Sequence, residues 1–216
     1  MSRIISGIAG GVPLVAVPGS ATRPTTDRVK EALFSRLDSL GMLSRARVLD
    51  LYAGSGALGV EAASRGASTV ELVESEAKAA HVCERNARTI NDALNRRAVT
   101  VRRAKVSAFL ERVPPGEHWD LVLMDPPYPL SEEQLASVLA AVAPRLAPDA
   151  LVVVERSARS PEPAWPAALA HFADRKYGET HLWFAELAPA RAPGEAVQID
   201  TAPEGGGVWA GRGEGF

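Results

Sequence analysis

The tetrapeptide Asp125-Pro126-Pro127-Tyr128 carries groups that could handle an exocyclic amine of a nucleobase. Two consecutive prolines stiffen the chain and remove two backbone donors, so their carbonyls and the Asp125 carboxylate form a fixed acceptor cluster. Such acceptors would hold the N–H groups of the amine and stabilise the positive charge that develops during methyl transfer. Tyr128 could stack on an extruded base. The tetrapeptide therefore predicts direct methyl transfer to a base amine, and a rigid turn with a packed tyrosine is the alternative.

A glycine-rich loop between Asp50 and Gly59 could bind the cofactor. Gly54, Gly56 and Gly59 form the pattern Gly-x-Gly-x-x-Gly, and Glu74 lies where a ribose-binding carboxylate would be expected. A dinucleotide would fit this spacing too. Asp50 favours S-adenosylmethionine (SAM), because a loop with a carboxylate and no basic residue would attract ammonium and sulfonium groups and repel a pyrophosphate. The alternative is a turn that only needs its glycines.

Alternating strands and helices would position both motifs. Short apolar runs occur at residues 48–52, 70–73, 99–101, 121–124 and 151–154, and helical patterns separate them. Because these runs are apolar nearly throughout, they indicate a parallel sheet that is covered on both faces. The carboxyl ends of parallel strands share one edge, so the glycine loop and the tetrapeptide should meet there.

The predicted fold class is α/β, and the chain divides into three parts. Residues 1–46 would form a small hairpin, Arg3 to Ser6 and Val12 to Val17, and a helix that starts at about Thr26. Residues 47–187 would form the main domain, which ends in an antiparallel hairpin (173–177 and 180–186). Residues 188–216 contain 7 Gly, 3 Pro and 6 Ala, which predicts a loosely ordered tail.

The composition is that of a globular protein, with 216 residues of which 46 % are hydrophobic and 23 % charged. A net charge of −2 would argue against a nucleic-acid partner, but the charge is unevenly distributed. Residues 1–47 contain 7 basic and 3 acidic side chains, and residues 88–112 contain 7 basic and 2 acidic ones. These two segments could contact phosphates beside the site, and a solvated surface is the alternative.

Cys83 is the only cysteine, so the chain cannot form an internal disulfide. Its helical context indicates a packed thiol, which argues against the cytosine-C5 mechanism and its cysteine nucleophile. No Cys/His cluster has the spacing of metal ligands, so we expect no metal. No signal peptide or apolar run of about 18 residues is evident, so we expect a cytoplasmic protein without membrane contact.

Taken together, these motifs resemble RsmD-type methyltransferases, which methylate the N2 amine of one guanine in small-subunit (16S) ribosomal RNA. The matching stretches are residues 3–7, 22–34, 50–62, 125–128 and 177–180. The resemblance covers about residues 1–187, and its most specific part is residues 22–34. The tetrapeptide alone is shared with DNA adenine-N6 methyltransferases.

The resemblance implies a Rossmann-like class I SAM-dependent methyltransferase with a seven-stranded, mostly parallel sheet, which acts as a monomer on 16S rRNA in a 30S subunit or an assembly intermediate. It implies that SAM is bound by Asp50, Ala53, Gly54, Ser55, Gly56, Glu74, Ser75, Ala104, Lys105, Val106 and Asp125. It assigns catalysis to Asp125, Pro126, Pro127 and Tyr128, and RNA contact to Arg3, Arg23, Arg28 and Lys30 in the N-terminal extension, which would also cover the site.

Two features depart from the family pattern. Lys105 follows the third strand where similar proteins usually offer an acidic residue to the adenine amine, so backbone groups near Ala104 to Val106 would hold adenine instead. The N-terminal hairpin is also poorer in basic residues than is usual.

Three other functions remain open at this point. A DNA adenine-N6 methyltransferase would share the tetrapeptide, although the short chain lacks a separate target-recognition domain. An NAD-dependent oxidoreductase would use the same glycine loop. A noncatalytic assembly factor would keep the fold without needing the tetrapeptide.

Overall fold

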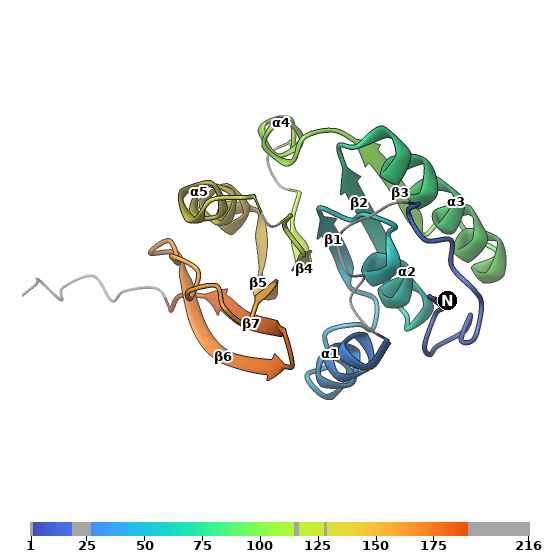
Figure 1. Ribbon diagram of the computed structural model, residues 1–216, viewed down its shortest axis with the longest axis horizontal. Coiled ribbons are helices and arrows are strands. Elements are labelled where there is room, and N and C mark those ends of the chain that lie inside the picture. Colours follow the sequence, from blue (N-terminus) through green and yellow to red (C-terminus); the bar gives the residue numbers. More distant parts are fainter. Residues whose placement is uncertain (1, 19–26, 115–116, 128, 190–216) are drawn as a thin grey trace, which may run out of the picture.

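Seven strands form one sheet in the order β3-β2-β1-β4-β5-β7-β6 (Figure 1). The computed structural model describes residues 2–18, 27–114, 117–127 and 129–189. Along the chain the elements are α1 (Asp27–Ser39), β1 (Arg47–Leu51), α2 (Ala57–Ser64), β2 (Thr69–Glu74), α3 (Ala77–Leu94), β3 (Val99–Arg103), α4 (Val106–Glu111), β4 (Trp119–Met124), α5 (Glu132–Val142), a short 3-10 helix (Ala143–Arg145), β5 (Leu146–Ser157), β6 (Leu169–Tyr177) and β7 (Thr180–Leu187).

The first five strands are parallel, and the last two complete the sheet in antiparallel pairing. β1 lies between β2 and β4, with Leu51 opposite both Val73 and Met124. β7 pairs antiparallel with both β5 and β6. The prediction of a mostly parallel, seven-stranded sheet that ends in an antiparallel hairpin is therefore confirmed.

Side chains from the two faces of the sheet fill two hydrophobic cores. Along β1, Val48 belongs to the core under α1, α2 and α3, whereas Leu49 and Leu51 belong to the core under α4 and α5. This alternation is the period-two pattern of a strand that is buried on both faces. Asp50 shares the face of Val48 and therefore points beneath α2, which decides its surroundings in the site.

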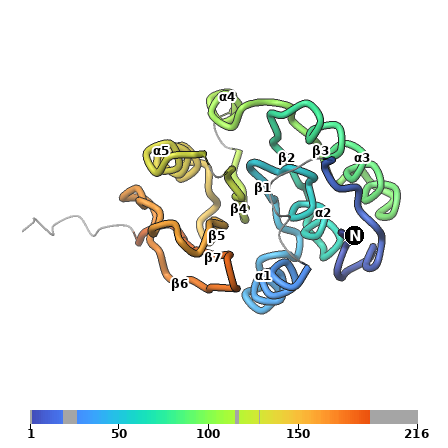
Figure 2. Tube along the Cα trace, viewed as in Figure 1, coloured from blue at the N-terminus to red at the C-terminus, as the bar shows by residue number. Residues whose placement is uncertain are grey.

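The expected N-terminal hairpin is short, with one antiparallel bridge and a few hydrogen bonds between its two arms. Arg3 pairs with Pro13, and Ile4 N–H donates to the Val12 carbonyl at 2.9 Å. Most other bonds of this segment run to α2 and α3, beside which it lies in Figures 1 and 2. The predicted pairing of residues 3–6 with 12–17 is therefore present in short form: Gly11 N–H donates to the Ile4 carbonyl at 2.8 Å and Leu14 N–H to the Ser2 carbonyl at 2.9 Å. Side chains of α2 and α3 bond to other backbone groups of the segment.

Helix α1 joins the same core as the sheet. Its apolar face buries Val29, Leu33, Phe34 and Leu37 against that core. Leu40 follows the end of the helix and is exposed. Thr26, where we expect the helix to start, and the part of the 188–216 tail beyond residue 189 lie outside the described residues.

Candidate active site

The glycine loop lies between β1 and α2, at the carboxyl edge of the sheet. Gly54 and Gly56 have φ angles of +57° and +79°, which L side chains rarely adopt. A Cβ atom on Gly54 would meet nothing within 4 Å, whereas one on Gly56 would lie 2.9 Å from Cys83 Sγ. Gly56 therefore permits close packing against α3, and Gly54 leaves an uncovered backbone that a ligand can approach.

Asp50 supports the start of α2 from below. Its Oδ2 accepts a hydrogen bond from Gly59 N–H at 2.9 Å, which is one of the free donors of the first helical turn. Burial raises the pKa of Asp50 to about 7, and the negative charges of Asp125 and Glu74 act in the same direction against the Gly59 bond. Only 1 % of the residue is exposed. This burial is at odds with the predicted direct contact to SAM, so we assign Asp50 the role of holding the loop.

Glu74 connects the end of β2 to the glycine loop. Its Oε2 accepts from Gly54 N–H at 2.9 Å and its Oε1 accepts from Glu76 N–H at 2.7 Å. The side chain is half-buried, and Ser75 beside it is exposed. Each carboxylate oxygen retains a lone pair, so the geometry still allows Glu74 to accept from hydroxyl groups.

The residues after β3 have fewer free groups for binding adenine than we expect from the sequence. Ala104 N–H is already bonded to the Glu74 carbonyl at 3.1 Å. Val106 begins α4 and is buried, while Lys105 is exposed. Contact between adenine and the backbone of residues 104–106 stays a prediction. The N–H group of Ala104 already has a partner within the protein.

Asp125 follows β4 at the same edge, next to the glycine loop. Because Met124 pairs with Leu51 in the sheet, Asp125 and Tyr52 leave their strands at the same level. Asp125 is open to solvent, yet the protein around it raises its pKa through desolvation. Pro126 is buried, and the Pro127 carbonyl accepts from Leu130 N–H at 2.9 Å. Tyr128 lies outside the described residues.

Comparison with known proteins identifies the family. The family described as "Conserved hypothetical protein 95", the RsmD family, matches residues 2–186. The chain belongs to this family. Ribosomal RNA small subunit methyltransferase D from Haemophilus influenzae is 33 % identical over 159 residues, which cover 74 % of this chain and 80 % of that protein. The protein of the same name from Escherichia coli K12 is 34 % identical over 165 residues, covering 76 % and 79 %.

A solved structure supports the same placement. A hypothetical protein from Thermus thermophilus is 31 % identical and superimposes with a TM-score of 0.73, over 87 % of this chain and 100 % of that one. Membership in the RsmD family and the predicted Rossmann-like methyltransferase fold are thus both confirmed. The DNA methyltransferase alternative is not favoured, because these curated relatives carry the names of ribosomal RNA methyltransferases.

The residues at this edge fit the SAM that the RsmD family implies. The uncovered Gly54 backbone provides space, and Glu74 provides acceptors beside it. The negative charges of Glu74 and Asp125 raise the pKa of the buried Asp50, so the carboxylates of this edge provide surroundings that suit a cationic ligand. Among the described residues, no group of His, Cys, Asp and Glu side chains could hold a metal ion, and no helix could cross a membrane.

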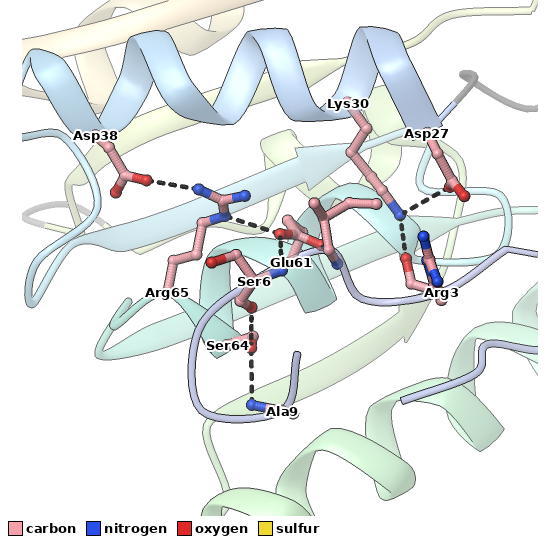
Figure 3. Close-up of polar contacts among 10 residues, drawn as sticks. Arg3, Ser6, Ala9, Asp27, Lys30, Asp38, Glu61, Ser64 and Arg65 are labelled. Atoms are coloured by element: carbon pink, nitrogen blue, oxygen red, sulfur yellow. Dashed lines mark hydrogen bonds and ion pairs between the residues drawn. The ribbon is translucent and has the colours of Figure 1, made fainter. Parts of the chain in front are cut away.

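The basic residues predicted to contact RNA differ in their surroundings. Arg3 and Arg28 are exposed, and Arg23 lies outside the described residues. Lys30 is 1 % exposed, and its Nζ donates to the Arg3 carbonyl at 2.5 Å and lies 3.8 Å from Asp27 Oδ1 (Figure 3). The prediction that Lys30 contacts RNA was therefore wrong, because its buried ammonium group binds the Arg3 carbonyl and so attaches the N-terminal segment to α1.

Sequence reasoning missed two residues of this site. Tyr52 adopts a φ of +62° directly after β1, a strained conformation for a non-glycine residue. Asn86 is a buried amide on α3 that bonds to the glycine loop. A polar residue within the otherwise apolar stripe of α3 was the available signal for Asn86, whereas nothing in the sequence marks the φ angle of Tyr52.

Proposed function

We propose that the protein is a SAM-dependent methyltransferase that methylates the exocyclic N2 amine of a guanine in 16S rRNA. The observation that carries the proposal is the position of Asp125, which follows β4 beside the open backbone of Gly54, in a chain of the RsmD family. Relatives at 33 % and 34 % identity are named for small-subunit rRNA methylation. The proposal includes a cytoplasmic, monomeric enzyme that acts on the 30S subunit or an assembly intermediate.

The cofactor would be held by the loop between β1 and α2 and by the end of β2. Gly54 gives close access to the backbone, and the oxygens of Glu74 would accept from ribose hydroxyls. SAM, when bound, supplies an electrophilic methyl group on a sulfonium centre. Asp50 would keep the loop in place through its hydrogen bond from Gly59 N–H.

The base amine would be held by acceptors at the end of β4. The Asp125 carboxylate and the Pro126 carbonyl would accept its two N–H groups, which directs the nitrogen lone pair toward the methyl group. As the new C–N bond forms and the C–S bond breaks, positive charge grows on the nitrogen, and the adjacent carboxylate stabilises it. One amine proton then leaves, and the raised pKa of Asp125 suits a group that receives a proton. Tyr128 would stack on the base.

The three parts of the chain would divide the work. Residues 1–46 would contact RNA through Arg3, Arg23 and Arg28, and residues 47–187 would carry out the transfer. The remaining tail receives no role in this scheme. The packing of α1 into the core of the sheet means that the N-terminal part would act as a fixed wall of the site.

The test uses purified protein, labelled SAM and 30S particles that lack the modification. We expect label in 16S rRNA, and N2-methylguanosine after digestion to nucleosides and mass spectrometry. Asp125→Ala should lower the rate by about 100-fold or more while SAM still binds in calorimetry. Asp149→Ala, a change at an exposed aspartate on the opposite edge, is the control. Labelling of duplex DNA in place of 30S particles would favour the DNA enzyme, and tight NADH binding would reject the methyltransferase.

A further inference from the structure

Asn86 is a buried amide that joins two distant parts of the chain. It lies on α3 with 1 % of its surface exposed. Its Oδ1 accepts from Val15 N–H at 2.9 Å, and its Nδ2 donates to the Val15 carbonyl at 2.9 Å and to the Ser55 carbonyl at 2.8 Å. The amide orientation is unambiguous, because the Val15 N–H can only donate and the two carbonyls can only accept.

The bond to Ser55 fixes a peptide plane of the glycine loop. In a trans peptide the carbonyl and the following N–H point in opposite directions, so a Ser55 carbonyl on Asn86 directs Gly56 N–H the other way, where it donates to Ala53 at 2.7 Å. The φ of +79° at Gly56 shows that this glycine uses conformational freedom that other residues lack. Without Asn86, that freedom would allow the plane to turn over and present a carbonyl where the N–H now points.

The bond to Val15 connects this loop to an N-terminal strap, residues 3–15. The strap is anchored at its other end on α2, where the buried Glu61 carboxylate accepts from the N–H groups of Ile5 (2.6 Å) and Ser6 (3.0 Å). Ser64 Oγ accepts from Ala9 N–H at 3.0 Å, as Figure 3 shows. The side chains of Glu61 and Ser64 therefore hold the strap on the C-terminal half of α2, and Asn86 holds it beside the start of that helix.

We propose that Asn86 is a positioning residue that makes the N-terminal strap part of the cofactor site. Through one amide, the register of the strap sets the peptide plane at Ser55, and displacement of the strap from α3 would loosen the loop. The strap precedes Arg23 and Arg28 in the chain. RNA that contacts these arginines would therefore also affect the link from the strap through Asn86 to Ser55. The inference depends on the proposed function only for the identity of the ligand.

Asn91 provides a matched control on the same helix. It also makes three hydrogen bonds to backbone groups, with Ala98 N–H, Val99 N–H and the Val99 carbonyl, at 2.8 to 2.9 Å. These bonds lie at the start of β3, which is the opposite edge of the sheet from the glycine loop. Asn91→Ala therefore removes an equal number of bonds without touching the loop.

The experiment is hydrogen exchange followed by mass spectrometry on the protein without cofactor. In Asn86→Ala we expect peptides that cover residues 53–60 to exchange about tenfold faster, since their amides report opening of the loop. Val15→Pro removes the N–H group that donates to Asn86 and leaves α3 unchanged, so exchange at residues 53–60 should also become faster. This variant tests the inference if Asn86→Ala does not fold. Asn91→Ala should lower the melting temperature and leave residues 53–60 unchanged.

SAM affinity is the second measurement. We expect calorimetry to show binding weakened about tenfold in Asn86→Ala and unchanged in Asn91→Ala. Unchanged exchange at residues 53–60 in a folded Asn86→Ala or Val15→Pro protein overturns the inference, and so does an equal change in Asn91→Ala. If the unaltered protein binds no SAM, the proposed function fails, and the exchange result still decides the role of Asn86.

Discussion

The side chain of Asp50 accepts a hydrogen bond that the fold requires, but its burial disfavours the charged form of the carboxylate. The Gly59 N–H requires an acceptor at this point, but burial and the nearby Asp125 and Glu74 raise the pKa of Asp50 to about 7. Between about pH 4 and 7 the native state therefore holds a proton that the unfolded chain has lost. The free energy of unfolding falls as pH rises through this window, by no more than about 4 kcal/mol for this group.

Asp50→Asn should remove this pH dependence. Asparagine retains an oxygen for the Gly59 N–H without a charge, so the stability of the variant relative to the unaltered protein should rise from pH 4.5 to pH 7.5, by about 1 to 4 kcal/mol. Urea unfolding across this range measures the difference.

Asp120→Asn is the control for this measurement. The Arg47 guanidinium lowers the pKa of Asp120, so this carboxylate is charged in both states throughout the range. Its replacement should lower stability by a constant amount. A difference for Asp50→Asn that stays flat with pH would contradict the raised pKa.

Two interactions fix the start of α5, the helix that follows Asp125 along the chain. Ser131 and Gln134 form a capping box that fixes the start of α5. At the next residue, Glu132 forms an ion pair with Arg156 of β5, whose side chain is 8 % exposed. Since Val154 pairs with Met124, Arg156 stands just beyond the end of β4, beside the segment that begins with Asp125. The ion pair thus holds the start of α5 against β5, next to the segment to which we assign catalysis.

Arg156→Met should misplace that segment without affecting the glycine loop. We expect the rate of methyl transfer in a single turnover to fall about 10- to 100-fold, because small displacements of reacting groups have effects of this size. The dissociation constant of SAM should stay within about twofold, since no residue of the glycine loop is touched.

Arg102→Met is the matched control for Arg156→Met. It breaks an exposed ion pair with Glu71 between β3 and β2 and should leave the transfer rate unchanged. A loss of thermal stability in Arg156→Met with an unchanged rate would show that the ion pair only stabilises the fold.

The strands and helices were largely predictable, because their apolar periodicity is local. The meeting of Asp125 with the glycine loop also followed, since both lie at carboxyl ends of parallel strands. The burial of Lys30 and the attachment of the N-terminal hairpin to α2 could not be predicted, because contacts between distant parts of the chain determine both. The spacing of residues in the sequence does not reveal that Lys30 donates to the Arg3 carbonyl. Nor does it reveal that the Glu61 carboxylate accepts from the backbone of the strap.

The distribution of charge over the whole molecule differs from its distribution along the chain. The sequence predicts one phosphate-binding surface for the basic segment 88–112. In the structure this segment includes β3, so its basic residues lie at both the amino and the carboxyl edge of the sheet. Arg96 and Arg97 lie at the amino edge, and Arg96 donates to the carbonyls of Ala67 and Ser68. Arg103 and Lys105 are exposed at the carboxyl edge, where Asp125 lies. Of these two pairs, we therefore expect the second to contact RNA that enters the site.

RNA affinity should therefore depend on one end of this segment. The Arg103→Ala/Lys105→Ala double variant should bind 16S rRNA or 30S particles more weakly, and the slope of log affinity against log salt should shrink by about 1.5, for two lost phosphate contacts. Arg97→Ala removes an equally exposed cation from the opposite edge and should leave both quantities unchanged. Filter binding from about 50 to about 300 mM KCl measures them. Equal losses in both variants would mean that RNA attraction follows total charge, and that its distribution over the two edges has no effect.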